Sequence, residues 1–384
     1  MYVSHLSLTN FRNYHHLELD LPEGLLVFSG GNGQGKSNLL EALYLLSIAK
    51  AYRANGDREA ISRTATEDPG HAQVVGVVRR ERDRVRILVD MALEGSWDDG
   101  ERPPHLRKEV RVDGIHVSAA DLVGAVNAVL FDAEDIRLVT GSPSTRRRFL
   151  DILICQLDRM YLRALQRYQK VVYQRNHLLR QIRERRSRAA ELDFWNEALV
   201  EDGAYIMLRR HRTVEELRPL LTELHGELTE TIEEFSVEYA AGVPIEQPGE
   251  AELKRSFQIA IEQGAEREIA LGATQSGPHR DDVRLTLGGM EAGIYASRGQ
   301  ARTLALALKL VEGMLLERER GESPVLLLDD VLSELDATRR RLLLERVERS
   351  QQAIVSTTDV DRIEGRFLAR AIAFRVERGN VMTQ

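Results

Sequence analysis

Residues 30–37 read Gly-Gly-Asn-Gly-Gln-Gly-Lys-Ser and match the pattern G-x-x-x-x-G-K-[ST] of a phosphate-binding loop. An apolar run that ends at Ser29 precedes this loop, and the helix-forming stretch 38–46 follows it. Glycines let backbone N–H groups wrap a phosphate without interference from a Cβ, and the start of the helix adds partial positive charge. The stretch therefore predicts an α/β fold with a nucleotide site. The residues expected at the nucleotide are Gly30, Asn32, Gly33, Gly35, Lys36, Ser37 and Asn38.

Two side chains of this loop carry specific chemistry. Lys36 is one of only six lysines in a chain with 47 arginines, and its ammonium is expected to reach the β- and γ-phosphates. The Ser37 hydroxyl is expected to hold Mg²⁺. The alternative is a chance match in an ordinary turn, and the flanking strand and helix argue against it.

A second apolar run, Val-Leu-Leu-Leu at 325–328, ends in the carboxylates Asp329 and Asp330. A carboxylate at the end of a buried strand is costly unless a cation or hydrogen-bond donors compensate its charge. Asp329 is therefore expected on the Mg²⁺ side of the nucleotide, and Asp330 stands where a general base could orient water. Alternatively, a strand ends here in a simple acidic turn.

A third element is Ser297-Arg298-Gly299-Gln300, followed by a helix expected from Ala301. The arrangement S-x-G-Q before a helix resembles the signature motif of ABC-type ATPases. A hydroxyl near a helix start, beside a glycine that permits close backbone approach, can form an anion site. Alternatively, Ser297 is a simple N-cap. The stretch 333–336, which ends in Asp336, resembles the D-loop of the same superfamily.

Composition limits the class of protein. With 384 residues, the chain has room for about two domains of ordinary size. Its 43% hydrophobic and 29% charged residues are typical of globular chains. The net charge of −7 excludes a general polycation that coats nucleic acid, so any such contact must use a local patch. A single cysteine, Cys155, excludes a disulfide framework within the chain. Without a targeting segment or a spanning apolar run, we expect a cytoplasmic protein.

The pattern along the chain predicts a head divided by an insertion. Strands are expected in 1–29, and antiparallel strands in 71–118 are expected to enclose a hairpin loop at 95–104. Buried strands are expected at 127–131, 324–330 and 353–358. Residues 144–239 have the periodicity of long helices, and a mixed loop is expected from 244 to about 270. We therefore predict a head formed by 1–143 and 270–384, and a mainly helical lobe formed by 144–269 with a short antiparallel helical arm.

The helical insertion has an uneven charge distribution. Residues 144–188 contain 13 Arg and Lys against 3 Asp and Glu, whereas 189–239 contain 4 against 13. One interpretation is an antiparallel helical hairpin whose two limbs attract each other, with ordinary solvated faces. The other is a basic limb that also contacts DNA phosphates. The two interpretations are compatible.

Five blocks together resemble the RecF family of bacterial recombination mediators. They are Asn-Phe-Arg-Asn-Tyr at 10–14, the loop and helix start at 30–40, Tyr-Arg at 52–53 with Asp-Arg-Glu at 57–59, Gly-Ser-Pro at 141–143 with Arg-Arg-Arg-Phe-Leu-Asp at 146–151, and Ser-Gly-Pro-His-Arg-Asp-Asp at 276–282. The resemblance implies an SMC-like ABC-type ATPase head with a helical second lobe. It further implies a chain that dimerises on ATP, binds DNA at gaps and at junctions of single and double strands, and works with RecO and RecR in loading RecA. No membrane partner is implied.

The resemblance also assigns roles to residues. Ser297, with Gly299 and Gln300, would meet the γ-phosphate held by Lys36 of a second copy, with Asp336 nearby. Arg12 and Arg53 match arginines that lie near the phosphates in related heads; alternatively, they are surface arginines. His279 and Arg280 are either functional or part of a turn braced by the adjacent acids.

The sequence departs from the ABC pattern in three places. Segment 131–138 has no glutamine, which leaves only Glu134 as a stand-in for the Q-loop residue, and no histidine lies near 356–359. Asp330 stands where a glutamate is usual, and its shorter reach implies slow hydrolysis suited to a timed switch. Two other readings stay open, the nucleotide-binding subunit of an ABC transporter and an interaction module with a vestigial loop. The basic helical insertion argues against the first, and the intact Lys36 and Asp329 argue against the second.

Overall fold

The computed structural model describes residues 1–384 except 54–55, 63–69, 82, 96–104, 230–233 and 246–248. The described chain forms two compact units. Unit 1 comprises Met1–Asp135 and Ala305–Gln384, and unit 2 comprises Ile136–Leu304. Helix α9 (Arg298–Arg320) contributes to both units. No helix in the described part of the chain has the length and apolar character that a membrane crossing requires.

The borders of these units differ from the borders expected for head and lobe. Unit 2 begins 8 residues before 144 and extends 35 residues beyond 269. The extension arises because β10 (Asp282–Leu287) pairs antiparallel with β9 (Phe235–Ala240), which holds the segment after residue 270 in the same unit as the helices. The two compact units do not test how the chain divides by function. The division into a head of 1–143 and 270–384 and a lobe of 144–269 therefore stays a prediction.

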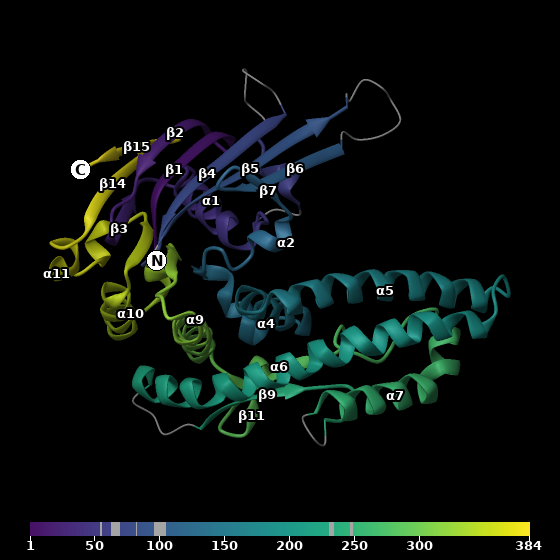
Figure 1. Ribbon diagram of the computed structural model, residues 1–384. Coiled ribbons are helices and arrows are strands. Elements are labelled where there is room, and N and C mark those ends of the chain that lie inside the picture. The colour runs from purple at the N-terminus through teal and green to yellow at the C-terminus, as the bar shows by residue number, and fades with distance from the viewer. Residues whose placement is uncertain (54–55, 63–69, 82, 96–104, 230–233, 246–248) are drawn as a thin grey trace. The chain divides into compact units, whose positions relative to one another are not determined.

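The first sheet of unit 1 is antiparallel, as the alternation in 71–118 predicts, and has the order β2-β1-β4-β5-β6-β7 (Figure 1). Its strands are β1 (Tyr2–Phe11), β2 (Tyr14–Asp20), β4 (His71–Arg79), β5 (Arg84–Glu94), β6 (His105–Val112) and β7 (Ile115–Val117). Alternate residues such as Leu6, Leu8 and Val74 are fully buried on one face. Most of the hairpin loop expected at 95–104 lies outside the described residues.

The second sheet of unit 1 is mixed and has the order β15-β14-β3-β13-β12-β8. Its strands are β3 (Gly24–Ser29), β8 (Ala128–Asp132), β12 (Val325–Asp329), β13 (Gln352–Thr357), β14 (Ile372–Glu377) and β15 (Asn380–Thr383). All neighbours are parallel except β15, which pairs antiparallel with β14. The strands predicted around residues 127, 324 and 353 are β8, β12 and β13. Their central residues are apolar, which is typical of strands covered on both faces, and their polar residues lie at the strand ends.

Helix α1 (Lys36–Ile48) links the two sheets of unit 1. It contacts β12 and β13 of the mixed sheet and β4 of the antiparallel sheet. Ten of its 13 residues are buried, which is typical of a helix enclosed by other elements. Gly76 of β4 allows the close approach, since a Cβ there would lie 2.3 Å from the Cδ1 of Leu46. The remaining helical segments of unit 1 are η1 (Asp57–Ala60), α2 (Ala119–Leu122), η3 (Ala133–Ile136), η5 (Val331–Glu334), α10 (Ala337–Arg349), η6 (Val360–Arg362) and α11 (Gly365–Leu368).

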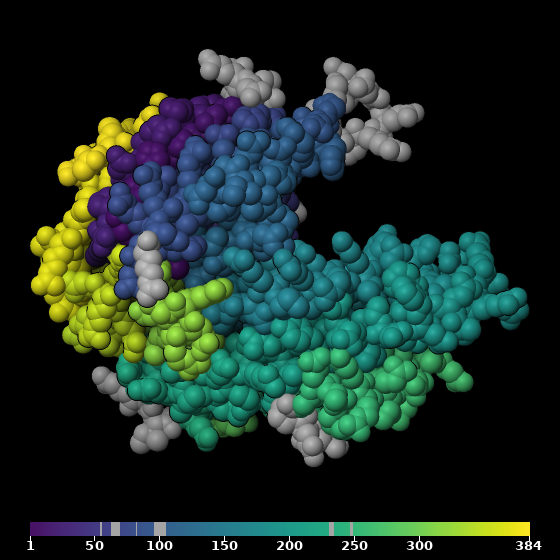
Figure 2. All heavy atoms as spheres, viewed as in Figure 1, coloured from purple at the N-terminus to yellow at the C-terminus, as the bar shows by residue number. Residues whose placement is uncertain are grey.

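Unit 2 is built around long helices, as the sequence predicts. Its helical segments are α3 (Arg137–Thr140), α4 (Pro143–Leu157), α5 (Arg159–Arg183), η4 (Ala189–Glu191), α6 (Leu192–Leu228), α7 (Glu250–Leu271) and α8 (Ala292–Tyr295). Helices α5 and α6 form the expected antiparallel hairpin, and α7 packs against both (Figure 1). In Figure 2 the teal atoms of α5 and α6 and the green atoms of α7 form one continuous body.

Two features of unit 2 were not predicted. The segment expected as a mixed loop from 244 to 270 is mostly helix α7, because Leu253, Phe257 and Ile261 recur every four residues and are buried. In addition, the unit contains a three-stranded sheet of order β11-β10-β9, with β11 at Met290–Glu291. The lobe is therefore mainly, but not wholly, helical.

A buried ion pair connects α5 with α7. The side chains of Arg175 and Glu268 are 1% and 0% exposed, and their Nη2 and Oε2 atoms lie 2.6 Å apart. Arg175 also donates to Asn196 and Thr274, while Glu268 accepts a hydrogen bond from the backbone of Gln275. The buried charge of Arg175 is thus compensated by Glu268 and by two further hydrogen bonds.

Candidate functional site

The ends of four parallel strands meet at one edge of the mixed sheet. Asp329 of β12 lies opposite Ser356 of β13 and Asp132 of β8, and Ser29 of β3 lies opposite Thr357. Ligands in open α/β sheets bind outside such carboxyl ends. The phosphate-binding loop follows β3 directly, so loop and carboxylates share this edge.

Two positive-φ glycines of the loop tolerate no side chain. Gly30 has φ 155°, and a Cβ there would lie 2.4 Å from the carbonyl oxygen of Val376. Gly35 has φ 125°, and its Cβ would lie 2.8 Å from the side chain of Asn13. Their positive φ, together with close packing against the backbone of Val376 and the side chain of Asn13, therefore favours glycine at both positions.

The turn between β1 and β2 holds the loop in place. The Asn13 amide donates to the Gln34 carbonyl at 2.9 Å, and the Tyr14 hydroxyl donates to the Gly35 carbonyl at 3.0 Å. The Asn38 amide in turn donates to the Asn13 side chain at 2.7 Å. This role of Asn13 and Tyr14 is not predicted by the sequence, although both residues belong to a block that carries the family resemblance.

The Lys36 ammonium lies against the loop that precedes it. Its Nζ donates to the carbonyls of Gly30 and Gly31 at 2.7 and 2.8 Å, and the residue is 7% exposed. Burial lowers the pKa of Lys36, and the nearby carboxylates of Asp330 and Asp329 oppose that shift. The positive charge is thus held at the centre of the loop.

Asp329 is the most connected acid of the site. Its side chain is 2% exposed, and its Oδ1 accepts hydrogen bonds from the hydroxyls of Ser37 at 2.8 Å and Ser356 at 2.7 Å. Its Oδ2 pairs with the Arg53 guanidinium at 2.5 Å, and the same Arg53 nitrogen lies 3.5 Å from Asp132. The sequence motifs predicted Ser37 and Asp329 together, whereas only the structure identifies Ser356.

Asp330 has an unusual backbone and an incompletely bonded side chain. Its φ of 52° is in the left-handed region, and its N–H donates to the Ser356 hydroxyl at 3.1 Å. Its Oδ1 is buried without a hydrogen-bond partner among the described residues. Burial raises the pKa of Asp330, and the Lys36 ammonium opposes the shift. A buried carboxylate oxygen without a hydrogen-bond donor, such as this Oδ1, is suited to accept a hydrogen bond from a water molecule.

These groups line a pocket of about 200 Å³. Eight of the predicted residues contribute to its lining, namely Asn32, Gly33, Gly35, Lys36, Ser37, Asn38, Asp329 and Asp330. Arg53 is a ninth, and Ser356 and Thr358 of the segment after β13 complete the wall. Ser356 and Thr358 therefore supply hydroxyl groups to this wall.

The donor set fits Mg²⁺. Ser37 and Asp329 offer two adjacent oxygen ligands, and Mg²⁺ is usually held by one or two carboxylates together with phosphates and water. The described residues contain no group of three or more His, Cys, Asp or Glu side chains that could form an all-protein metal site. A metal here would therefore depend on a bound phosphate for its remaining ligands.

Four other predicted residues of unit 1 lie outside the pocket lining, and one of them is Gly30. The Arg12 guanidinium pairs with the buried Glu41 carboxylate at 2.8 Å and donates to the Glu59 carbonyl. Asp336 caps α10 by accepting from the backbone of Arg339 at 2.9 Å. The Glu134 side chain is exposed, and its backbone N–H donates to Asp132 at 3.0 Å.

The remaining predicted residues belong to unit 2. The Ser297 hydroxyl accepts from the N–H of Gln300 at 3.3 Å, and the Gln300 side chain accepts from the N–H of Ser297 at 2.8 Å. This reciprocal pair is a capping box, and the helix begins at Arg298 rather than Ala301. Ser297 and Gly299 are exposed. The N-cap role and an anion-binding role are compatible in this geometry.

The block at 276–282 forms a braced turn in unit 2. The Tyr168 hydroxyl lies 2.7 Å from Nδ1 of His279, and Nε2 of His279 lies 3.2 Å from the Thr274 carbonyl. Asp281 accepts from the backbone N–H of Gly242 at 2.8 Å. These contacts favour the braced turn over a solvent-facing functional histidine.

Comparison with known proteins agrees with this geometry. Residues 2–378 match the model of the RecF/RecN/SMC N terminal domain family. The chain is 40% identical to the DNA replication and repair protein RecF of Chloroflexus aurantiacus and 38% identical to that of Bacillus subtilis, and each match covers 99% of both chains.

Solved structures give the same result. A structure of the recombination mediator protein RecF with ATP, from the RecFOR pathway, aligns with a TM-score of 0.88 at 31% identity and covers 100% of this chain and 97% of that chain. An SMC head bound to the C-winged helix domain of ScpA aligns with a TM-score of 0.54 at 16% identity over 100% of this chain and 98% of that chain, which shows a shared fold. The predicted SMC-like head is confirmed, and the chain belongs to the RecF family of DNA replication and repair proteins.

Proposed function

We propose that this chain is an ATP-dependent DNA-binding protein of recombinational repair. It binds ATP with Mg²⁺, dimerises on ATP, binds DNA at gaps and at junctions of single and double strands, and helps RecO and RecR to load RecA. Hydrolysis is slow and stimulated by DNA, so ATP acts as a timer. The observation that carries the proposal is the pairing of the phosphate loop with Asp329 through Ser37 at 2.8 Å. A relative of the same family has been solved with ATP, which supports this nucleotide.

Each residue of the pocket has a proposed task. The Lys36 ammonium neutralises the β- and γ-phosphates, and the backbone N–H groups of the loop bind their oxygens. Ser37 and Asp329 hold Mg²⁺, which supplies charge neutralisation at the phosphates when it is bound. Asp330 accepts a hydrogen bond from the attacking water through its free Oδ1 and so orients it. Arg53 is close enough to Asp329 to contact either that carboxylate or a phosphate.

The proposed DNA surface is the solvent face of α5. This helix has six arginines, one lysine and no acidic residue. Arg159, Arg163 and Lys170 are exposed and share one face because they are spaced by whole helical turns. Tyr173 is 68% exposed on the same face and could stack on a base. This arrangement suits contact with the phosphate backbone and does not predict base-specific recognition.

The proposed test measures affinity for gapped duplex DNA of random sequence, with and without ATP. We expect ATP to strengthen binding, and we expect Lys36→Met to abolish this effect. Arg163→Glu combined with Lys170→Glu should weaken binding and reduce the salt dependence by about two phosphate contacts. Arg255→Glu is the matched control, since Arg255 is an exposed arginine of α7. DNA affinity that is independent of ATP would instead favour an interaction module with a vestigial loop.

We further propose that two copies complete each ATP site. In this arrangement Ser297 of one copy meets the γ-phosphate that Lys36 of the other copy holds. Ser297→Arg and Lys36→Met should each abolish turnover alone, and a mixture should recover part of it, because a heterodimer can carry both lesions in one site and leave the other intact. Labelled subunits must confirm that heterodimers form. Heterodimers without recovered turnover would mean that Ser297 acts within its own chain or not at all.

A further inference from the structure

A short segment joins Asp330, the acid proposed to orient water, to Asp336, the N-cap of α10. It contains η5 and follows directly on β12. Leu332 and Leu335 are 1% and 7% exposed, so apolar burial anchors the segment in unit 1. Its carbonyl groups need donors of their own, because a single turn of 3-10 helix satisfies few of them.

Two arginines supply these donors. Arg340 of α10 donates from Nε to the Leu332 carbonyl at 3.1 Å and from Nη2 to the Leu335 carbonyl at 2.8 Å. Arg362 of η6 donates from Nη1 to the Ser333 carbonyl at 3.0 Å. Arg340 also donates to the carbonyl of Arg362 at 3.4 Å, which connects the two. Arg340 and Arg362 together form an arginine clamp on the segment.

The backbone of Asp330 needs support from its surroundings. Its φ of 52° lies in the left-handed region, which is unfavourable for a residue with a Cβ and persists only where neighbouring contacts impose it. On one side, its N–H donates to the Ser356 hydroxyl at 3.1 Å. On the other side, its carbonyl accepts from the Ser333 hydroxyl at 2.7 Å. Ser333 is also the residue whose carbonyl Arg362 holds, so the clamp is one hydrogen bond removed from the strained turn.

Arg362 also connects the segment with the chain that follows β13. Its Nε pairs with Asp359 at 3.2 Å, and the N–H of Asp359 donates to the Thr357 hydroxyl at 3.1 Å. Thr358, between these two residues, lines the nucleotide pocket. Burial raises the pKa of Asp330, and the Thr358 backbone and the Arg362 guanidinium are among the groups that oppose the shift. Arg362 therefore acts on Asp330 through its charge as well as through the backbone.

Stabilisation of the fold alone is a less suitable role for the clamp. The side chains of Arg362 and Asp359 are 42% and 49% exposed, and ion pairs with this exposure contribute little to stability. The segment is already anchored by its two buried leucines. Hydrogen bonds that add little to stability but fix three successive carbonyls beside a reacting group are suited to hold that group in place.

We propose that Arg340 and Arg362 are positioning residues for ATP hydrolysis. They hold the segment after Asp330, which keeps the backbone of Asp330 left-handed and its carboxylate at the nucleotide pocket. This inference rests on the proposed role of Asp330 in orienting the attacking water. Neither arginine is among the described residues that line the pocket. The clamp should therefore set the rate of hydrolysis and leave the affinity for ATP unchanged.

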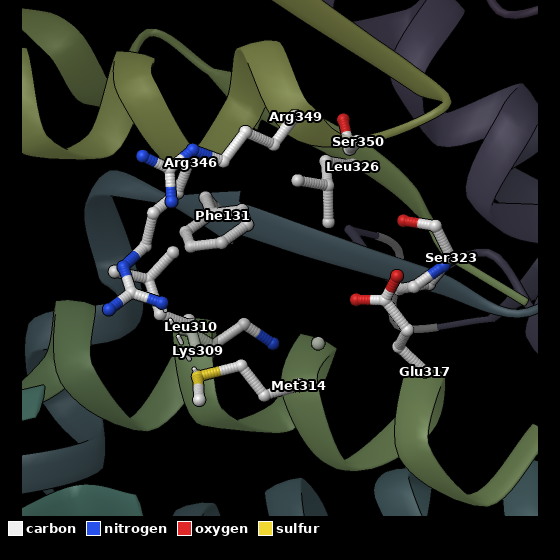
Figure 3. Close-up of a pocket in the computed structure, with 12 residues that line it drawn as sticks. Phe131, Lys309, Leu310, Met314, Glu317, Ser323, Leu326, Arg346, Arg349 and Ser350 are labelled. Carbon is white, nitrogen blue, oxygen red and sulfur yellow. Dashed lines mark hydrogen bonds between the residues drawn. The ribbon is translucent and has the colours of Figure 1, made fainter. Parts of the chain in front are cut away.

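Helix α10 offers a matched control. Arg349 is an exposed arginine of the same helix, and it lines a separate cavity of about 200 Å³ together with Phe131 and Leu326 (Figure 3). Arg349→Met removes the same charge from α10 as Arg340→Met does. It leaves the carbonyl contacts of the clamp in place.

The test uses the full chain with ATP and Mg²⁺. Calorimetry measures the affinity for ATP, and phosphate release in a single turnover measures the rate of hydrolysis. Arg340→Met and Arg362→Gln should each lower this rate about tenfold or more with unchanged affinity, because a small displacement of a reacting group is enough for such a loss. Arg340→Lys should be nearly as slow as Arg340→Met, since an ammonium keeps the charge but not the planar fork that meets two carbonyls. Arg349→Met should turn over at the rate of the unaltered chain.

A double-mutant cycle tests whether the clamp acts through Asp330. In the Asp330→Asn chain, Arg362→Gln should cause less than about a twofold further loss of rate, because the carboxylate that it positions is already absent. A further loss of about tenfold in that chain would overturn the proposal, since the two residues would then act independently. Arg362 is exposed, so its replacement tests the inference even where Arg340→Met folds poorly.

Three other results would overturn the inference. The first is unaltered turnover in Arg362→Gln and Arg340→Lys while Asp330→Asn is slow, which would refute the clamp and leave the proposed function intact. The second is a loss of ATP affinity in the clamp variants that equals their loss of rate, which would assign the arginines to the structure of the pocket. The third is unaltered turnover in Asp330→Asn, which would refute the proposed role of Asp330 and the clamp together.

Discussion

His279 should make the stability of unit 2 depend on pH. Its Nε2 must be the donor to the Thr274 carbonyl at 3.2 Å, since a carbonyl can only accept. Its Nδ1 therefore accepts from the Tyr168 hydroxyl at 2.7 Å, and the folded state holds the neutral imidazole. Burial lowers the pKa of His279 from 6.5 to about 4; the hydrogen bond to Thr274 opposes this shift, and the smaller effects of Arg280 and Arg147 add to it.

The magnitude follows from the two pKa values. Between pH 6.5 and 4 the unfolded chain binds a proton at His279 that the folded chain does not bind, so acid favours unfolding. The pKa difference of 2.5 (6.5 − 4) corresponds to a total loss of about 3 kcal/mol, at about 1.4 kcal/mol per pKa unit. About 2 kcal/mol of this loss should occur between pH 7.5 and pH 5.

The assay is urea unfolding followed by the fluorescence of Trp195, which packs against the buried Leu178, Leu179 and Leu192 of unit 2. The other tryptophan, Trp97, lies outside the described residues and is replaced by phenylalanine in all chains. His279→Gln keeps a donor for Thr274 and an acceptor for Tyr168 but cannot titrate.

Other groups also titrate in this range, so the difference between the two chains is the quantity of interest. The His279 chain should lose about 2 kcal/mol more free energy of unfolding than His279→Gln between pH 7.5 and pH 5. Equal losses in the two chains would refute the assignment of a buried neutral imidazole.

Three further predictions concern single residues. Asp330→Asn should bind ATP but hydrolyse it far more slowly, measured as phosphate release in a single turnover, and an unchanged rate would assign Asp330 to structure. Glu268→Gln should lower the free energy of unfolding by about 3–5 kcal/mol, because it leaves the buried charge of Arg175 uncompensated; a loss below about 1 kcal/mol in urea titration would contradict this. Gly30→Ala should destabilise the loop and abolish ATP binding by calorimetry, since its methyl group would meet a carbonyl oxygen of β14 at 2.4 Å, whereas Gly31→Ala, with its closest contact at 3.8 Å, should be nearly neutral.

The chemistry of the site could be predicted because each motif is local. Residues 30–37 and the acids Asp329 and Asp330 at the end of β12 carry their roles in a few consecutive positions, and the structure brings Ser37 and Asp329 within 2.8 Å. The strands and the helical hairpin could also be predicted, since their apolar residues follow clear periods. Their pairing order could not be predicted, because it depends on contacts between residues far apart in the chain.

The failures have specific physical causes. The sequence predicts a loop where helix α7 lies, because the charged and glycine-containing stretch around Gly264 masks a narrow apolar face of Leu253, Phe257 and Ile261. Ser356 belongs to no motif that the sequence identifies, so its hydroxyl contacts with Asp329 and with the N–H of Asp330 could not be predicted.

The phosphate loop also depends on distant segments for its shape. From the antiparallel sheet, the Asn13 side chain donates a hydrogen bond to the Gln34 carbonyl of the loop. From the mixed sheet, the N–H of Gly379, in the turn after β14, donates to the same carbonyl at 3.0 Å. The two turns also touch each other, since a Cβ on Gly379 would lie 2.5 Å from the Asn13 carbonyl oxygen. A loop rich in glycine loses much conformational entropy when it is fixed, and these contacts fix it before any phosphate arrives. The motif therefore determines which groups the loop can bind. The contacts from both ends of the chain determine how much conformational entropy the loop still loses when the nucleotide binds, and so they affect its affinity.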